Sequence, residues 1–189
     1  FSVTCEDDGR AEDPEVLRRV GSTTSDLDRH KRGRFGQGLV DVVSIATSAE
    51  ILTLNHRLAF DAEGCRIGRV GSRLGGMRLS ATLRHGGEGS ENIADYFGSV
   101  VLPESVAFTF NGAKARRRQT KRVVSDIRLQ TVLYDPESDR IKLRTEPTSI
   151  ELVDQHGPAP RIYELGIPVD DMPWSLPFDV NVLQKTPVD

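Results

Sequence analysis

Cysteine is scarce in this sequence, and several patterns that define a protein class at once are missing. The two cysteines, Cys5 and Cys65, are too few for a disulfide framework and cannot build a zinc site on their own. The four histidines are scattered without the spacing of metal ligands. No apolar run comes near the ~18 residues of a transmembrane helix. Disulfide-rich and helical membrane-spanning classes are therefore not expected.

A strong excess of positive charge is also missing. The net charge is −3 and the isoelectric point is about 5.9, which excludes a generally basic protein that coats nucleic acids. Residues 1–13 are acidic and lack the apolar core of a signal peptide, so we expect a reducing, cytoplasmic environment. What is present is 189 residues with 37% apolar and 28% charged side chains, enough for one globular domain with a sizeable core.

The chain begins at Phe1, without an initiator Met, in a pattern of alternating bulky and small residues that is typical of a strand. It stops at residues 185–189 with no pattern typical of a domain end. We therefore expect a fragment of a longer protein.

Short segments in which apolar and polar residues alternate predict many strands, and three stretches predict helices. Asn111-Gly112 is a strong hairpin signal. Most of the ten prolines follow residue 135, and a domain boundary is expected near residue 112. The expected helices are 14–20, 39–47 and 91–101. The expected strands are 1–5, 50–55, 57–61, 66–70, 77–83, 106–110, 123–134, 140–144, 149–153 and 161–165.

Two features in a fixed order indicate a nucleotide site. The first strand delivers Asp7 and Gly9 at a turn, where a carboxylate can accept a hydrogen bond from the exocyclic amine of adenine and a glycine lets a flat ring approach. The second feature is the glycine-rich loop Gly33–Gly38, which opens an apolar helix and offers free N–H groups to phosphates. Between them, Ser22–Ser25 can fold over a ligand as a lid.

This ordered set of motifs resembles the GHKL ATPases: MutL-type mismatch-repair proteins, ninety-kilodalton heat-shock chaperones and type II topoisomerase ATPase domains. The resemblance covers roughly residues 1–112. The segments that carry it are Cys5–Ala11 for the Asp-x-Gly-x-Gly adenine motif, Gly21–Ser25 for the lid, Gly33–Thr47 for the phosphate loop and its helix, Gly76–Leu79 for a Gly-Thr step, and Ile93–Gly112 for the last helix, strand and Asn-Gly turn.

The resemblance implies an α+β fold, a two-layer α/β sandwich with a mixed sheet covered by helices (Bergerat-type), followed by a β-rich extension over 113–189. It also implies a parent ATPase that binds ATP and Mg²⁺ and uses lid closure to regulate a partner interaction, with a homodimer as one possible partner. Gln184-Lys185-Thr186 is similar to the Gln-Thr-Lys loop by which topoisomerase-like relatives reach the γ-phosphate. The implied cofactor-binding residues are Asp7, Gly9, Thr24, Phe35, Gly36, Gln37, Gly38, Met77 and Lys185.

The chain departs from the family's pattern at three points. Ala11 replaces the second glycine of the adenine motif, and Met77 replaces the usual threonine. The family's Glu-x-x-x-Asn-x-x-Asp motif lies upstream of a strand like the first one, and nothing precedes that strand here. Residues 88–95 match its spacing, but Glu88 falls before the expected helix cap Ser90. We therefore expect no catalytic residue in this chain and no magnesium-dependent ATP hydrolysis by it alone.

A second hypothesis is a non-catalytic scaffold or a nucleic-acid-binding module on a degenerate ATPase fold. Residues 114–122 concentrate basic side chains that could contact a phosphate backbone, although no aromatic residue is interleaved for base stacking. The same run also fits a solvated hairpin flank. Likewise, Asp7 and Gly9 also fit an ordinary turn, because both residue types are turn formers.

Overall fold

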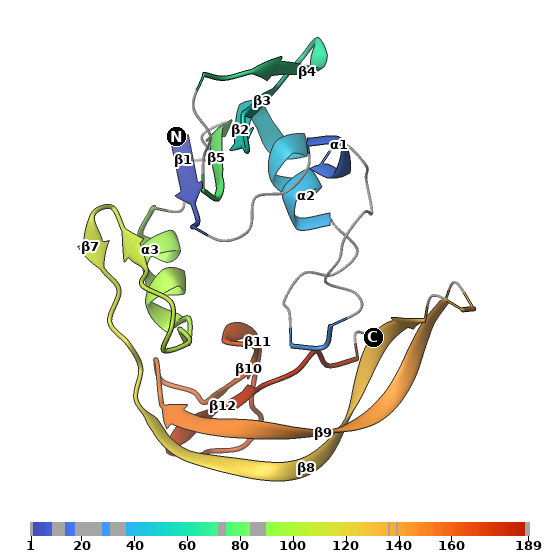
Figure 1. The fold of residues 1–189 in the computed structure, drawn as a ribbon. Coiled ribbons are helices and arrows are strands. Elements are labelled where there is room, and N and C mark those ends of the chain that lie inside the picture. The colour runs from blue at the N-terminus through green and yellow to red at the C-terminus, as the bar shows by residue number, and fades with distance from the viewer. Residues whose placement is uncertain are drawn as a thin grey trace. The chain divides into compact units, whose positions relative to one another are not determined.

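The computed structural model describes residues 2–8, 14–17, 28–30, 37–71, 75–83, 90–135, 137–138 and 140–187. The chain divides into two compact units, each with a five-stranded sheet of its own (Figure 1). Unit 1 comprises Phe1–Thr24 and Gly33–Gly87, and unit 2 comprises Ser25–Arg32 and Glu88–Asp189. This division falls earlier in the chain than the boundary predicted near residue 112.

The sheet of unit 1 is antiparallel throughout. Its strand order is β1-β5-β2-β3-β4. The strands are β1 (Ser2–Glu6), β2 (Ala46–Thr53), β3 (His56–Asp61), β4 (Gly64–Arg69) and β5 (Met77–Leu83), and the helices described in this unit are α1 (Pro14–Leu17) and α2 (Gln37–Ile45).

The two faces of this sheet differ in polarity. On one face Ile51 of β2 is fully buried opposite Leu58 of β3, and Ala49 is buried opposite Ala81 of β5. The other face carries hydroxyl pairs such as Thr4 with Ser80 (3.2 Å), together with ion pairs between neighbouring strands. The period-two alternation of the sequence produces this division, because successive side chains of a strand point to opposite faces.

Unit 2 is built around a second sheet with the order β11-β10-β12-β9-β8. β10 and β12 are parallel, and the other pairs are antiparallel. The strands are β8 (Thr120–Asp135), β9 (Arg140–Asp154), β10 (Arg161–Glu164), β11 (Ile167–Asp171) and β12 (Phe178–Val182), preceded by α3 (Ser90–Ser99) and the short hairpin β6 (Thr109–Phe110) and β7 (Ala113–Lys114).

The Asn-Gly hairpin prediction is confirmed. Asn111 and Gly112 both have positive φ, 49° and 77°, as the tight primed turns between two strands require. The hairpin packs on α3 through aromatic rings: the Phe97 ring centroid lies 5.3 Å from that of Phe108 and 4.9 Å from that of Phe110. Val101, Val153 and Tyr163 form the buried cluster of this unit.

The prediction of two separate strands at 140–144 and 149–153 is wrong. They form the single 15-residue strand β9, which pairs with the 16-residue β8. Pro147 lies inside this strand, opposite Arg128 on β8. β12 pairs with Ile150–Asp154, so Pro147 lies where β9 has a partner strand on one side, an edge position at which a proline is tolerated.

The resemblance to GHKL ATPases is also wrong as a statement of fold and family. That family has an α/β sandwich with helices covering a mixed sheet, whereas the described part of this chain is β-rich with three sheets. The described residues contain one four-residue helix and two helices of nine and ten residues. Strands, formed where apolar and polar residues alternate, occupy most of the described part of the chain.

The apolar stripe predicted as a helix over 39–47 is one helix, α2, but it ends at Ile45, and β2 begins at Ala46. The last residues of the predicted helix, 46–47, belong to β2 instead, because β2 pairs with β5 from Ala46, which lies opposite Leu83. Among the described residues, no helix has the length and apolar content needed to span a membrane.

Candidate functional site

The end of β1 brings together two of the residues predicted to bind a nucleotide. The backbone N–H of Asp7 donates to the carbonyl of Met77, with the two atoms 3.0 Å apart. The residue before Asp7, Glu6, accepts two hydrogen bonds of 3.0 Å from the guanidinium of Arg78. These contacts extend the β1–β5 ladder to the strand end and hold an exposed aspartate there.

A glycine makes this close approach possible. A Cβ added at Gly76 would lie 1.9 Å from the backbone oxygen of Asp7, far inside van der Waals contact. The side-chain oxygen of Asp7 lies 3.0 Å from the same point. Gly76 is buried, and its neighbour Gly75 is exposed with open space around it. The geometry of Asp7 therefore depends on the absence of a side chain at Gly76.

The first turn of α2 carries Gln37 and Gly38, which were predicted to bind phosphates. This turn holds no acidic residue, and Gly38 is exposed with no atom near the position of an added Cβ. α2 runs directly into β2 at Ala46, opposite Leu83, and contacts both β2 and β5. The helix therefore packs back along the sheet, with its N-terminus toward the end of β5 that holds Met77 (Figure 1).

Four of the predicted binding residues lie outside the described residues: Gly9, Thr24, Phe35 and Gly36. The predicted lid, Ser22–Ser25, lies outside them as well. So does Glu88, the first residue of the segment 88–95 that matches the Glu-x-x-x-Asn-x-x-Asp spacing. Their roles stay predictions.

Lys185 belongs to unit 2 and is buried, with 1% of its surface exposed. Its backbone N–H donates to the carbonyl of Arg29 at 2.8 Å. Gln184 donates its side-chain amide to the carbonyls of Leu129 and Gln130, and the backbone N–H of Thr186 donates to Glu164 at 2.7 Å. This segment is thus built into unit 2, and a contact of Lys185 with a phosphate stays a prediction.

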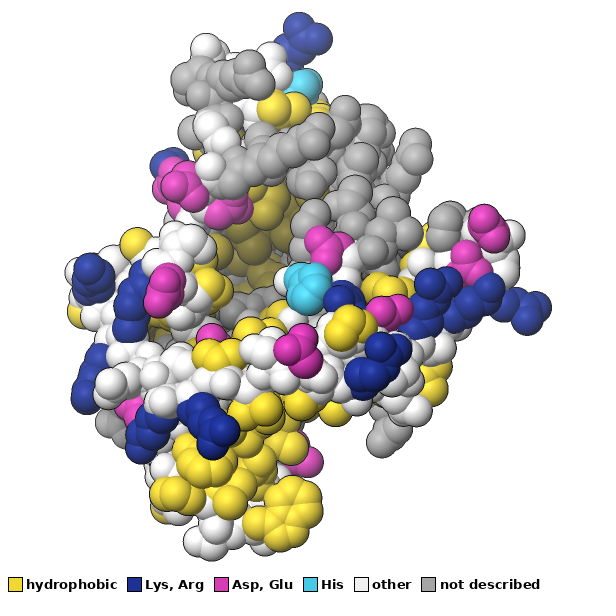
Figure 2. All heavy atoms as spheres, turned by 60° about the horizontal axis from the view of Figure 1, so that its bottom comes forward, with side chains coloured by type: hydrophobic (Ala, Val, Ile, Leu, Met, Phe, Trp, Pro, Cys, Tyr) yellow, Lys and Arg dark blue, Asp and Glu magenta, His cyan; other side chains and the backbone are white. Residues whose placement is uncertain are grey.

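The basic run over 114–122 has divided roles. The guanidinium of Arg117 donates to the carbonyls of Pro103, Glu104 and Val106, each at 2.7 Å. The side chain of Arg118 is only 5% exposed. On the face drawn in Figure 2, Lys and Arg side chains lie in separate groups among hydrophobic and acidic ones. Nucleic-acid binding by this run stays a prediction; Arg118 is buried, and the exposed Arg117 is hydrogen-bonded to backbone carbonyls of its own chain.

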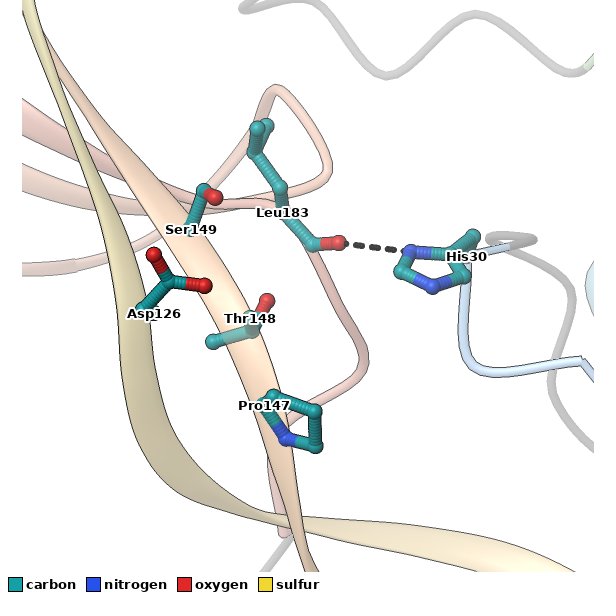
Figure 3. A pocket seen from close by; sticks show the side chains of 6 residues that line it. All are labelled: His30, Asp126, Pro147, Thr148, Ser149 and Leu183. Carbon is teal, nitrogen blue, oxygen red and sulfur yellow. Dashed lines mark hydrogen bonds between the residues drawn. The ribbon is translucent and has the colours of Figure 1, made fainter.

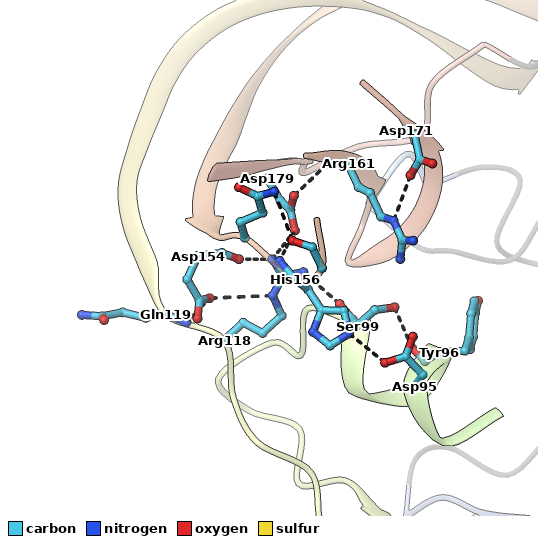
Figure 4. Close-up of polar contacts among 12 residues, drawn as sticks. Asp95, Tyr96, Ser99, Arg118, Gln119, Asp154, His156, Arg161, Asp171 and Asp179 are labelled. Carbon is cyan, nitrogen blue, oxygen red and sulfur yellow. Dashed lines mark hydrogen bonds and ion pairs between the residues drawn. The ribbon is translucent and has the colours of Figure 1, made fainter. Parts of the chain in front are cut away.

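Arg118 is the centre of a polar cluster that the sequence did not reveal (Figure 4). Its guanidinium donates to Asp179, which is fully buried, to the backbone oxygen of Asp154, and to the carbonyl of Ser99 at 2.9 Å. Asp179 also accepts the backbone N–H groups of His156 (3.1 Å) and Arg161 (2.7 Å). A buried charge is stable only when paired and hydrogen-bonded in this way.

Tyr163 lies beside this cluster. The guanidinium carbon of Arg118 is 4.9 Å from the centre of the Tyr163 ring, a cation–π distance. The Tyr163 side chain is fully buried, its hydroxyl has no hydrogen-bond partner, and burial raises the pKa of the phenol. The cluster ties α3, β10 and β12 to the segment before β8, so we assign it a structural role.

No group of three or more His, Cys, Asp or Glu side chains that could hold a metal ion occurs within the described part of the chain. Comparison with known families finds no family model that matches the sequence, and comparison with curated proteins finds no match. The candidate site at the end of β1 therefore rests on its own geometry.

Proposed function

We propose that unit 1 binds an adenine nucleotide, with the base at Asp7. The observation that carries this proposal is the exposed carboxylate of Asp7, held at the end of β1 by its bond to Met77 and by close packing against Gly76. A carboxylate only accepts hydrogen bonds, and the exocyclic N6 amine of adenine donates them. Gly76 lets the backbone of β5 approach Asp7 closely and so fixes the position of this residue at the strand end.

The start of α2 supports the phosphate half of the proposal. Helix N-termini carry unpaired N–H groups and a partial positive charge, which stabilise anions. The first turn of α2 contains no carboxylate that would repel a phosphate, and its N-terminus faces the same end of the sheet as Met77. Magnesium would arrive with the phosphates, and the proposal assigns it no protein ligand.

Calorimetric titration of the protein with ATP tests the role of Asp7. We expect Asp7→Ala to weaken ATP binding by about tenfold or more, the cost of one hydrogen bond to a charged group. Asp8→Ala is the matched control, because Asp8 is the adjacent, equally exposed aspartate, and it should bind ATP as the wild type does. GTP should bind more weakly than ATP, because guanine presents an acceptor, O6, where adenine presents a donor.

The proposal fails if the wild-type chain binds no ATP, or if Asp7→Ala and Asp8→Ala bind it equally well. Lid closure and its effect on a partner, including a second copy of the chain, depend on residues outside the described part and stay predictions. A reducing, cytoplasmic environment also remains our proposal, supported by two cysteines that are exposed and free.

A further inference from the structure

The two faces of the unit 2 sheet differ in their surroundings. Successive residues of a strand point to opposite faces, and paired residues of neighbouring strands point to the same face. Val153 and Tyr163 of the buried cluster therefore share one face with Asp179, which is fully buried, and Val180 lies on the other. We call this second face, which carries Val180, the outer face.

One row of paired residues crosses the outer face from edge to edge. It takes one residue from each strand, and consecutive members are cross-strand partners. In the order β8, β9, β12, β10 and β11, the row is Arg122, Leu152, Val180, Ile162 and Asp170. The three apolar side chains in the middle are half-buried, and the two charged ends are exposed. The row thus has a positive end, an apolar centre and a negative end.

More apolar side chains widen the centre of this face. Val124 pairs with Ile150, two residues along β9 from Leu152, and all three lie on the outer face. Phe178 lies two residues before Val180 on β12. Like the centre of the row, Val124, Ile150 and Phe178 are half-buried. Figure 2 shows hydrophobic side chains gathered in one patch in the lower part of the view. A contiguous apolar surface that remains partly exposed marks a contact site for another molecule.

The middle strands of the face are fixed by contacts beyond β12. The backbone N–H of Leu183 donates to the carbonyl of Ser149 at 3.1 Å, which extends the pairing of β12 with β9 by one residue. The carbonyl of Leu183 accepts a hydrogen bond from Nδ1 of His30 at 3.0 Å (Figure 3). Because these contacts hold β12 in place, the face needs little reordering to bind a partner.

Both edges of the sheet are poorly suited to pair with a further strand. β8 bulges between Val124 and Ile127, where Asp126 has a positive φ of 61°. β11 contains Pro168, which has no N–H to donate, and the register of β11 against β10 shifts after Ile162. Bulges and prolines protect an edge strand against pairing with another chain. A partner is therefore expected on the face of this sheet and not at its edges.

We infer that the outer face of unit 2 binds the same face of a second copy of this chain. A two-fold axis parallel to the strands, through the centre of the row, reverses the row in the second copy. Arg122 of each copy then lies opposite Asp170 of the other, and the apolar centres pack against each other as two sheets do in a sandwich. A two-fold axis across the strands would bring like charges together, so the charge pattern selects the first arrangement.

The size of the face predicts a weak dimer. Five strands ~4.8 Å apart make it roughly 20 Å wide, and the five residues of β12 make it roughly 15 Å long. The resulting area of roughly 300 Å² is well below the ~800 Å² per partner of a standard stable interface, so association requires a high protein concentration. Binding of a nucleotide by unit 1 plays no part in it.

Sedimentation velocity on the whole chain, over a rising series of protein concentrations, measures this association. We expect the average mass to rise from 20.9 kDa toward twice that value and no further. Arg122→Glu alone and Asp170→Arg alone should each weaken the dimer about tenfold or more, because each places like charges opposite each other. The double variant should restore it. Arg116→Glu, at an exposed arginine before β8, is the control and should behave like the wild type.

Val180→Thr tests the apolar centre of the face. It keeps the shape of the side chain and adds a hydroxyl that the dimer would bury without a partner, so it should also weaken association. Circular dichroism checks that each variant is folded, and should Val180→Thr not fold, the exposed charge variants decide alone.

A chain that stays monomeric at every concentration, a mass that grows past two copies, or a double variant as weak as the single ones would each overturn the dimer. The first result would assign the outer face to a partner of another kind, and the second would indicate head-to-tail contacts.

Discussion

Neighbouring arginines in one basic run have different surroundings in this protein. Arg116 is exposed, the guanidinium of Arg117 holds three backbone carbonyls, and Arg118 is buried against Asp179. The three positions share the same charge and the same neighbourhood in the sequence. Only the contacts made by the folded chain separate a solvated cation from a structural one.

Arg118→Ala should lower the free energy of unfolding by about 3–5 kcal/mol. The reason is that the substitution leaves Asp179 buried without its counter-charge, which costs more than the net contribution of the pair. Urea unfolding followed by circular dichroism measures the change. Arg116→Ala, two residues away and exposed, is the control and should stay within about 0.5 kcal/mol of wild type. Equal effects of the two substitutions would contradict the assignment.

Asp135 should titrate unusually low. Its hydrogen bond and ion pair with Lys142, aided by Ser138, hold the pKa of this carboxyl at about 2, compared with 3.8 ordinarily. A lowered pKa stabilises the fold above about pH 4, and this contribution is lost as the pH falls toward 2. NMR titration of the side-chain carboxyl measures the value. Lys142→Met should raise the pKa toward 3.8, whereas Lys121→Met should leave it near 2; an ordinary pKa in the wild type would refute the pair.

At the scale of elements, local patterns predicted the existence of a strand more accurately than the residues at which it begins and ends. Met77–Leu83 was predicted residue for residue, because alternation extends over the whole strand. The last residues of the helix predicted over 39–47 belong to β2 in the structure. Local patterns could not show this, because the pairing of β2 with β5 is a long-range interaction. Pro147 lies inside β9 at a position where β8 is the neighbouring strand and β12 does not pair, and a proline is tolerated at such an edge.

The junction of β1 and β5 allows a sharp test of an element. Gly76→Ala places a Cβ against the backbone oxygen of Asp7, so β1 must shift, and we expect a loss of stability of about 1–3 kcal/mol. Thermal or urea unfolding measures this loss. Gly75→Ala adds the same methyl group in open space one residue earlier and should be close to neutral. If the two substitutions are equally tolerated, the close approach at Gly76 is wrong.

At the scale of the whole molecule, the chain has two compact units, each with its own buried residues. Ile51 and Leu58 are fully buried in unit 1, as are Val153 and Tyr163 in unit 2. Separate cores give each unit its own resistance to local opening. We therefore expect the two units to unfold separately and not as one two-state system.

Amide hydrogen exchange on two variants tests this separation. Arg118→Ala should speed exchange in β8–β12 while β2, β3 and β5 keep the protection of the wild type. Gly76→Ala should do the reverse, because each substitution disrupts contacts within one unit only. Uniform loss of protection across the chain in both variants would show that the units unfold together.

The candidate nucleotide site was predictable in part. A strand-end aspartate and a helix with glycine at its start are local features, and Asp7 and Gly38 could be selected from them. That Gly76 and Met77 lie against Asp7 depends on pairing between strands about seventy residues apart, which local patterns do not encode. The β-bulge at Asp126 had no local signal, because a register shift becomes visible only when β8 and β9 are paired.

The sequence by itself predicted the five strands of unit 1 with shifted ends, the Asn-Gly turn and the absence of an overall positive charge. Periodicity and turn chemistry act over a few residues, and net charge depends on composition alone. The tertiary structure decided which strands are neighbours, which prolines and arginines are structural, and that strands rather than a covering layer of helices form most of the described chain. These outcomes depend on contacts between distant residues, so short motifs that resembled an ATPase family could not reveal the fold. The scarcity of cysteine and histidine excluded whole classes of protein, but the proposed nucleotide site depends on a single carboxylate, Asp7, whose surroundings only the folded chain defines.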